Sequence, residues 1–116
     1  MMSIKPHVQA VIDGIVTGKI LETFDAYYAD HVVMSENRTD ERVGKQVNRE
    51  YEIQFLDNVH EFHGAQVGRV IVEGDHAAVE WSFDFTFKDG NRVKMQQVAV
   101  QTWEHGKIVR EDFYHG

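Results

Sequence analysis

The chain has 116 residues, enough for one domain with a packed core and too few for two. Its formal net charge of −7, with histidine counted as neutral, argues against nucleic acid or anionic membranes as partners. Cysteine is absent, which excludes disulfides, a thiol nucleophile and a thiolate metal site. The first ten residues contain no long apolar run. We therefore expect neither a signal peptide nor a transmembrane span, and a cytoplasmic protein with one domain over residues 1–116.

Apolar residues at helical spacing predict three helices in the first half of the chain. These helices span about residues 6–18, 19–29 and 45–62. In the third helix the predicted buried face is Val47, Tyr51, Phe55, Val59 and Phe62. Between the second and third helices, residues 31–36 predict a short strand, and residues 37–44 read as a polar connection.

Alternating apolar and polar residues from about residue 65 to the end predict four antiparallel strands separated by glycine turns. The element order is helix, helix, strand, helix and four strands, which indicates an α+β fold. A long, bent sheet with helices on one face tends to enclose a pocket. The side chains that face inward then decide what that pocket can do.

Turn length decides those faces, because opposed residues of a hairpin point to the same side of the sheet. At residues 88–90 a three-residue Lys-Asp-Gly turn gives one coherent apolar face and opposes Asp84 to Lys94 on the other. A two-residue Asp-Gly turn mixes the faces, so the three-residue turn is favoured. The preceding turn, as a two-residue Gly-Asp loop, opposes Gly68 to Trp81.

The last turn, in the segment WEHGK, leaves two alternatives for the final strand. A three-residue Glu-His-Gly loop turns inward one set of side chains: Glu111, Phe113 and His115. A two-residue His-Gly loop turns inward the alternate set: Arg110, Asp112 and Tyr114. The three-residue loop is favoured, and the second set stays open.

The element order, the segment YADHVVMSE and the ending WEHGKIVREDFY resemble the SnoaL-like and ketosteroid-isomerase-like proteins of the nuclear-transport-factor-2-like superfamily. The resemblance implies a cystatin-like α+β barrel, in which a cone-shaped, curved antiparallel sheet wraps around three helices and forms a deep apolar cavity. It also implies a homodimer that pairs through the outer sheet face. The residues expected to be apolar on that face are Val98, Val100, Ile108 and Tyr114.

Glu36 takes the place of the carboxylate that moves a proton in ketosteroid isomerases, according to the resemblance. An apolar cone raises the pKa of a carboxyl group toward working pH, as a general base needs. The tyrosine and protonated acid of the family's oxyanion hole are replaced by Ile12 and Ala99. Steroid isomerisation by that mechanism is therefore not expected. The alternative is that Glu36 is a solvated residue at a strand end.

Glu111 and His115 are the other candidate catalytic residues. Four residues apart on one strand, they lie roughly 13 Å apart, so they can flank a ligand without touching each other. Glu36 and Glu111 in one apolar cone push their pKa values apart, which makes one a proton donor and the other an acceptor. The alternative is that Glu111 pairs with an arginine or sits at the rim, and that the end of the chain is frayed.

The predicted ligand-binding side chains combine aromatic rings with amides. Inward-facing amides are costly unless they bond to a ligand, to water or to other protein groups. The full predicted set is Met34, Trp81, Phe83, Gln97, Gln101, Trp103 and Phe113.

The sequence predicts neither a metal site nor a cofactor. Its histidines lack the HExxH spacing, and it has no GxSxG motif, P-loop or dinucleotide fingerprint. Three hypotheses remain. The first is an isomerase-, cyclase- or hydratase-type enzyme that uses acid–base chemistry on a hydrophobic carbonyl compound. The second is a non-catalytic binder of a small hydrophobic molecule, and the third is a dimeric interaction module.

Overall fold

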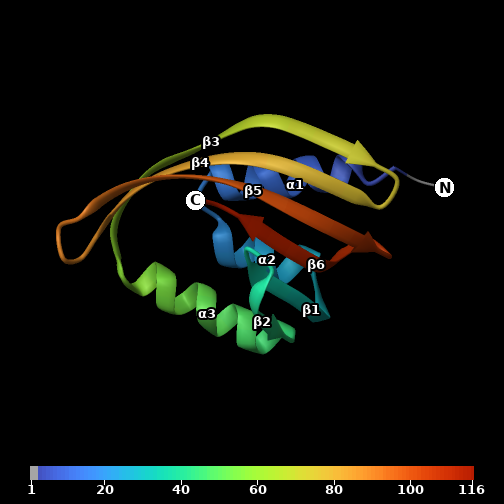
Figure 1. Cartoon of the computed structure of the whole chain (residues 1–116), viewed down its shortest axis with the longest axis horizontal. Helices are drawn as coiled ribbons and strands as arrows, with labels where there is room; N and C mark the ends of the chain where they lie inside the picture. The colour runs from blue at the N-terminus through green and yellow to red at the C-terminus, as the bar shows by residue number, and fades with distance from the viewer. Residues whose placement is uncertain (1–2) are drawn as a thin grey trace.

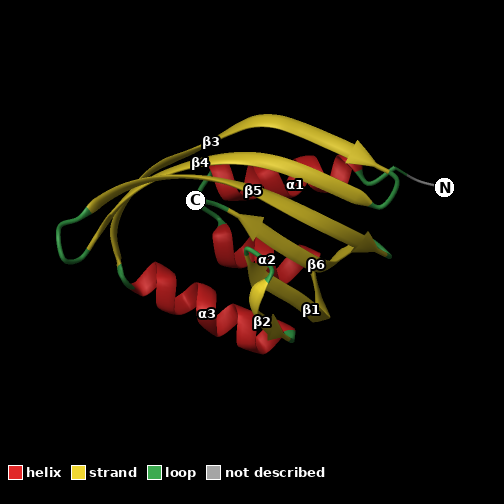
Figure 2. Cartoon of the chain, viewed as in Figure 1, coloured by secondary structure: helices red, strands yellow, loops and turns green. Residues whose placement is uncertain are grey.

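A computed structural model describes residues 3–116, in which a strongly curved sheet arches over three helices (Figures 1 and 2). The helices are α1 Lys5–Val16, α2 Ile20–Tyr27 and α3 Lys45–Asp57. The strands are β1 Tyr28–Glu36, β2 Thr39–Val43, β3 Val59–Glu73, β4 His76–Phe87, β5 Arg92–Glu104 and β6 Lys107–Tyr114. The strand order is β2-β1-β6-β5-β4-β3, and all neighbours are antiparallel except β1 and β6, which are parallel. The predicted α+β class and curved sheet are confirmed.

Three predicted boundaries in the first half are wrong. The second helix ends at Tyr27, so β1 begins at Tyr28 and not at residue 31. The polar connection over 37–44 contains a strand, β2, whose exposed residues pair with β1 in a short hairpin. The third helix ends at Asp57, and the backbone N–H of Asn58 closes it by donating to the carbonyl of Phe55 at 3.1 Å. Val59 and Phe62 continue the helical spacing only by coincidence, since both lie on β3.

The predicted register of the β4–β5 hairpin is confirmed, with Asp84 opposite Lys94 across a three-residue turn. The β3–β4 hairpin closes with a two-residue turn as expected, but a β-bulge shifts its pairing further along. Val67, not Gly68, lies opposite Trp81. The carboxylate of Glu80 fills the bulge and accepts the backbone N–H of Arg69 at 2.7 Å.

The last turn is the two-residue form, so the favoured three-residue loop is wrong. Glu104 pairs with Lys107, and His105 and Gly106 have φ values of 51° and 76°. Two successive positive φ angles are those of a type I′ turn, which matches the twist of a hairpin. Glycine at the second position meets this conformation without strain.

A β-bulge next to this turn restores the predicted faces of β6. Trp103 pairs with Ile108, but the next pair is Thr102 with Arg110, which leaves Val109 as the extra residue. Glu111 therefore faces inward as predicted, although the turn differs. The two-residue turn places Ile108 opposite Trp103 and so in the core, where Ile108 is 0% exposed, so its predicted place on the outer face is wrong.

The core occupies the end of the sheet that α1 and α2 cover. Ile12 and Ala99, the two positions expected to lack oxyanion-hole donors, are both buried within it. Helix α3 lies under the other end of the sheet (Figure 1). There side chains leave part of the enclosed space open, and this space is the candidate site.

Candidate functional site

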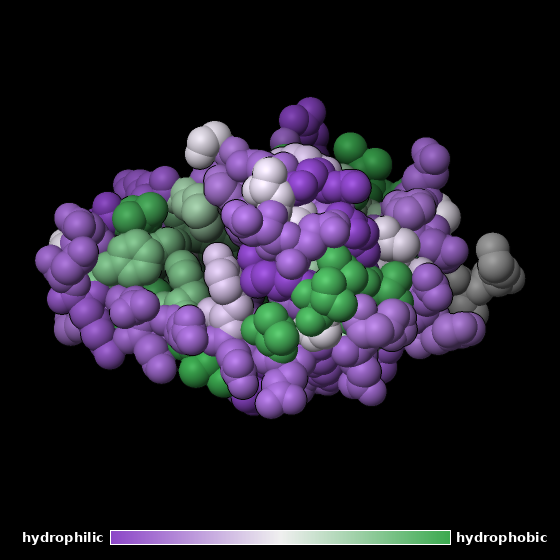
Figure 3. Space-filling view, turned by 60° about the horizontal axis from the view of Figure 1, so that its bottom comes forward, coloured by the Kyte–Doolittle hydropathy of each residue, from purple (hydrophilic) through white to green (hydrophobic). Residues whose placement is uncertain are grey.

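A cavity of about 360 Å³ lies between the concave face of the sheet and helices α2 and α3. On the face shown in Figure 3, hydrophobic side chains gather around a hollow near the β4–β5 end of the molecule. The aromatic residues of its wall include Phe24, Phe55, Trp81, Phe83, Phe85 and Phe113. The ring of Trp81 stacks on that of Phe83 with centroids 5.1 Å apart. Such a wall suits a flat, apolar ligand.

Seven of the ten predicted site residues line the cavity, and three do not. Those in the wall are Glu36, Trp81, Phe83, Gln97, Glu111, Phe113 and His115. Met34, Gln101 and Trp103 are each 1% exposed and lie behind the wall, so their predicted contact with a ligand is not supported. The closed end of the sheet is filled by α1, where His7 stacks on Trp103 with centroids 5.9 Å apart.

Gln101 and Trp103 instead orient Glu111 from behind. The indole Nε1 of Trp103 donates to Oε1 of Gln101 at 3.0 Å, and Nε2 of Gln101 donates to Oε2 of Glu111 at 2.9 Å. Because an indole N–H only donates, it fixes which end of the amide faces Glu111. Oε1 of Glu111 forms a hydrogen bond with the hydroxyl of Tyr28. Tyr28 also lines the cavity.

The environment of Glu111 holds its carboxyl group close to neutrality. Burial raises the pKa of Glu111 to about 7, against the hydrogen bonds from Tyr28 and Gln101, while Glu52 and Glu36 raise it further. Burial, followed by the charge of Glu111, raises the pKa of Tyr28 well above its ordinary value. Tyr28 therefore stays protonated, and Glu111 is the member of the pair that titrates.

When Glu111 is neutral, only one of its two carboxyl oxygens can carry the proton. Oε2 faces a donor, the Gln101 amide, so the proton belongs on Oε1 beside Tyr28. The carboxylic O–H then donates to the Tyr28 oxygen and leaves the phenolic O–H free to donate into the cavity. In the ionised state Tyr28 donates to Glu111, and that donor is lost to a ligand.

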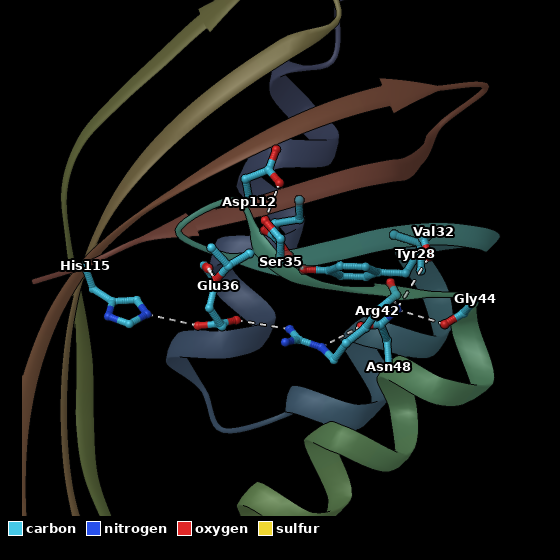
Figure 4. A network of polar contacts seen from close by, with 11 residues as sticks. Tyr28, Val32, Ser35, Glu36, Arg42, Gly44, Asn48, Asp112 and His115 are labelled. Carbon is cyan, nitrogen blue, oxygen red and sulfur yellow. Dashed lines mark hydrogen bonds and ion pairs between the residues drawn. The ribbon is translucent and has the colours of Figure 1, made fainter.

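Glu36 lies at the end of β1 between two partners on different elements (Figure 4). Its Oε2 accepts from Arg42 at 3.0 Å, and its Oε1 lies 3.1 Å from Nε2 of His115. Arg42 is itself held by Oδ1 of Asn48 at 3.1 Å and lies 3.8 Å from the ring centre of Tyr51. Glu36 is thus a fixed group in the cavity wall, which excludes the alternative of a freely solvated strand end.

His115 is attached to the end of β1 and to the turn that follows it, and is not frayed. Its backbone N–H donates to Oδ1 of Asn37 at 2.9 Å, while its ring reaches Glu36. Glu111 and His115 make no direct contact, as predicted from their spacing. They belong to two separate hydrogen-bonded groups that both reach the cavity.

The alternate set of the final strand lies on the other face of the sheet. Asp112 is 5% exposed, accepts from the hydroxyl of Ser35 at 2.6 Å and from Nε of Arg110 at 3.0 Å, and lies 3.9 Å from Arg38. Burial alone would raise the pKa of Asp112, but the bonds from Arg110 and Ser35 lower it on balance. None of Arg110, Asp112 and Tyr114 lines the cavity.

Sequence reasoning missed three polar residues of the site: Tyr28, Arg42 and Glu52. Tyr28 was assigned to the second helix, although it begins β1. Of the predicted buried face of α3, Phe55 and Tyr51 line the cavity, but Tyr51 is 44% exposed, and Val47 is 51% exposed and does not line it. The inward face instead follows the spacing of Asn48, Glu52 and Phe55, which polar residues made hard to recognise as buried.

Glu52 differs from the other carboxyl groups of the cavity because it has no hydrogen-bonding or ionic partner among residues 3–116. Burial raises its pKa to about 7, against the attraction of Arg42, and the charge of Glu36 adds to the rise. Three carboxyl groups, Glu36, Glu52 and Glu111, thus line one apolar cavity. Within residues 3–116 no three His, Asp or Glu side chains are grouped to hold a metal ion. In the same part of the chain, each helix is too short or too polar to cross a membrane.

Comparison with protein families matches residues 8–111 to the model of the SnoaL-like domain. Among curated proteins no significant match was found. Many solved structures are similar, and one is a putative SnoaL-like polyketide cyclase from Mesorhizobium loti. It is 30% identical, with a TM-score of 0.83 over 98% of this chain and 100% of that one.

Two further structures are similar in fold at lower identity. A protein of unknown function with a cystatin-like fold from Xanthomonas campestris is 18% identical, with a TM-score of 0.84 over 99% of this chain and 92% of that one. A hypothetical protein with a ketosteroid-isomerase-like fold from Catenulispora acidiphila, in complex with trimethylamine, is 10% identical. Its TM-score is 0.77 over 95% of this chain and 85% of that one.

Proposed function

This chain belongs to the SnoaL-like domain family, and we propose that its cavity binds a small hydrophobic carbonyl compound and moves a proton on it by acid–base chemistry. The observation that carries the proposal is the Tyr28–Glu111 pair in the cavity wall. It combines a carboxyl group of pKa about 7 with a phenol that stays protonated. Groups that titrate near working pH are those that transfer protons efficiently.

Tyr28 supplies the donor that a developing enolate oxygen needs. With Glu111 neutral, the phenolic O–H is free to donate to a ligand carbonyl, and the carboxylic O–H behind it strengthens that bond. The Tyr28–Glu111 pair, on β1 and β6, thus provides the hydrogen-bond donor that Ile12 on α1 and Ala99 on β5 lack. Trp103 and Gln101 keep the pair in this order.

Glu36 is the acceptor in this proposal. Each of its oxygens holds one hydrogen bond, from Arg42 or His115, and a carboxylate oxygen has two lone pairs. A lone pair therefore remains to accept a proton from the carbon next to the ligand carbonyl. His115 and Arg42 act as positioning residues, because they fix the orientation of the carboxylate.

Two relatives support the proposal. The Mesorhizobium loti protein, named a putative SnoaL-like polyketide cyclase, is aligned over its whole length, and polyketides are carbonyl compounds. The Catenulispora acidiphila protein is complexed with a small molecule, which supports ligand binding by this fold.

The test is exchange of α-protons into D2O, followed by NMR over a panel of cyclic and aromatic ketones. We expect exchange with the wild type and a loss of about 100-fold in both Tyr28→Phe and Glu36→Gln, the scale of removing one such group. Tyr114→Phe, on the outer sheet face, is the matched control and should keep full activity. The rate should also fall above about pH 7, because ionised Glu111 then accepts the hydrogen bond of the Tyr28 O–H and leaves no donor for the ligand. Equal activity of Tyr28→Phe and Tyr114→Phe would contradict the proposal.

The second candidate is a non-catalytic binder, which the apolar aromatic wall and Gln97 favour. Trp81 reports on this because it lies in the wall. If ketones change the fluorescence of the protein and this change is reduced in Trp81→Phe, while no α-proton exchanges, the cavity binds without turnover. Unchanged fluorescence across the panel contradicts both candidates.

We also infer a homodimer through the outer sheet face, where Val98 and Val100 on β5 lie next to Tyr114 on β6. Tyr114 is 38% exposed in the single chain, and Val98 and Val100 beside it are partly exposed, so the three form one patch on the outer face. Light scattering after size exclusion should give twice the monomer mass, and Val98→Asp should give the monomer. A monomeric wild type contradicts the inference.

A further inference from the structure

We propose that the ligand of this cavity carries an organic cation, an amine or quaternary ammonium group, which is bound by Glu52. The inference rests on the proposed ligand binding and adds the charge of the ligand to it. Its basis is the difference between Glu52 and the two other carboxyl groups of the same wall.

Glu52 is the one carboxyl group in the cavity wall without a partner in residues 3–116. Glu36 has Arg42 and His115, and Glu111 has Tyr28 and Gln101. Its side chain is only partly buried, so the unpartnered carboxyl group can be reached from the cavity. The carboxyl of Glu52 lines an apolar space, and a bound donor in that space would satisfy it.

No protein cation is free to take that role. Arg42 on β2 attracts Glu52, but its guanidinium donates to Glu36 and Asn48 and covers the ring of Tyr51. Among residues 3–116, no lysine or arginine lines the cavity, and the imidazole of His115 is engaged with Glu36. The other charged or titratable groups near Glu52 add negative charge or none: Glu36, Glu111 and Tyr28. The field inside the cavity therefore favours a positive ligand.

The remaining wall suits an organic cation better than a small inorganic one. Phe55 lies one turn after Glu52 on α3, and Trp81 and Phe83 present stacked rings from β4. Aromatic faces attract ammonium groups, most strongly where water is excluded. One carboxylate beside several rings offers too few oxygen ligands for a hard metal ion, which needs six or more.

Ionisation of Glu52 gives the proposal a pH dependence. Burial raises the pKa of Glu52 to about 7, although the positive charge of Arg42 opposes the rise. Glu52 is therefore mostly neutral at pH 6 and mostly charged at pH 8. A simple alkylamine stays protonated across this range. Cation affinity should therefore increase from pH 6 to pH 8, in the same direction as ionisation of Glu111. Binding near pH 7 should release protons, because the cation favours the carboxylate.

The experiment measures, by titration calorimetry, the affinities of three probes that share a phenyl ring: 2-phenylethylamine, 2-phenylethanol and 3-phenylpropanoate. We expect the amine to bind at least about tenfold tighter than the alcohol at pH 8, the range of a charge-assisted hydrogen bond, and the acid to bind weakest. The preference should shrink at pH 6. In two buffers of different ionisation enthalpy, the amine titration at pH 7 should report proton release.

Two variants separate Glu52 from general surface charge. Glu52→Gln should bring the amine-to-alcohol ratio close to one and leave alcohol affinity unchanged. Glu50→Gln removes the same charge from an exposed position of the same helix and should keep the wild-type ratio. If Glu52→Gln fails to fold, the pH dependence and proton release are measured in Glu111→Gln, in which Glu52 is the remaining cavity carboxyl with a pKa of about 7. Equal affinity for amine and alcohol, or an equal loss in both variants, overturns the inference and leaves the proposed cavity binding intact. Absence of binding by all three probes overturns both.

Discussion

Glu111 and Asp112 are consecutive carboxyl residues of one strand, both nearly buried, and they differ in every property that matters for chemistry. Glu111 faces the cavity and bonds to two uncharged groups, Tyr28 and Gln101, and its pKa rises to about 7. Asp112 faces the other side of the sheet and bonds to Arg110 and to Ser35, and its pKa is lowered. The presence of an arginine on one face and its absence on the other decides the outcome.

The comparison shows how one strand serves two purposes. On the outer face, cations hold Asp112 in its charged form, which ties β6 to β1 and makes it a structural residue. On the inner face, neutral donors orient Glu111 without fixing its charge, so that it can exchange a proton. A matched amide substitution at each position therefore should have opposite effects on stability.

The largest effect is expected from Asp112→Asn, which disrupts the hydrogen-bonded group of Asp112, Arg110 and Ser35 on the outer face, here called the outer group. The amide keeps one acceptor oxygen but turns its NH2 toward a donor, and Arg110 loses one of its two carboxylate partners and keeps Glu41. Removing one partner of a buried ion pair costs about 3 kcal/mol. Urea unfolding at pH 7 measures this, with Ser35→Ala as a milder control expected to lose about 1 kcal/mol. A loss below 1 kcal/mol in Asp112→Asn would show that the outer group does not hold the strands.

The next effect concerns the inner group, which is Glu111 with Tyr28 and Gln101. Here ionisation of the carboxyl group lowers the stability of the fold, whereas ionisation of Asp112 raises it. In the unfolded chain the carboxyl of Glu111 titrates near 4.5, and in the folded protein at about 7. Its contribution to stability is therefore full below pH 4.5 and is lost as the pH rises through 7, a change of about 3 kcal/mol. Glu52 adds a smaller loss in the same window, because part of its side chain remains accessible.

Glu111→Gln imitates the neutral acid and should remove much of this pH dependence. At pH 8 the variant should be more stable than the wild type by about 2 kcal/mol, and at pH 4 nearly equal to it. Urea unfolding at several pH values checks both statements. A wild type whose stability increases from pH 5 to pH 8 would contradict the assignment of the inner face.

The smallest effect is expected from Gly106→Ala, which tests whether the turn before β6 decides which face of the sheet Glu111 takes. Gly106→Ala forces a side chain into a conformation at φ 76°, while its nearest neighbour, Nε2 of His7, is 3.8 Å away. The cost is therefore conformational and should be about 1 kcal/mol, with Gly18→Ala, at φ 82° and with no atom within 4 Å, as a matched control. Activity should survive, because the bulge at Val109, not the turn, sets which face Glu111 takes. A large loss of activity in a folded Gly106→Ala protein would show that the turn sets the face.

The sequence predicted the sheet better than the site, for physical reasons. The β4–β5 register followed from local signals, namely turn chemistry and the opposition of Asp84 and Lys94, and it is confirmed. In β6 the inward place of Glu111 is right, although the predicted turn is wrong, because a bulge shifts the register by one residue. Bulges have no strong signal in a single sequence. A second bulge, in β3, likewise puts Val67 opposite Trp81 in place of the predicted Gly68.

Glu52 and Tyr28 could not be recognised because their roles depend on distant contacts. Tyr28 is separated from Glu111 by most of the chain, and periodicity placed it in a helix. Glu52 reads as an ordinary solvent-facing residue of α3, since helical patterns assign charged residues to the outside. Only the curvature of the sheet over α3 makes that face of the helix an inner wall.

The pKa values of the glutamates, followed by the 13C shifts of their carboxyl carbons between pH 3 and pH 9, test the central claim most directly. We predict two glutamates that titrate near pH 7, one of which disappears in Glu111→Gln and the other in Glu52→Gln. Glu80, whose pKa is lowered to about 2 by its bonds from Arg69, provides an internal contrast. A protein in which every glutamate titrates below pH 5.5 would contradict the account, because Glu111 would then be ionised at neutral pH and would accept the Tyr28 O–H that the ligand needs.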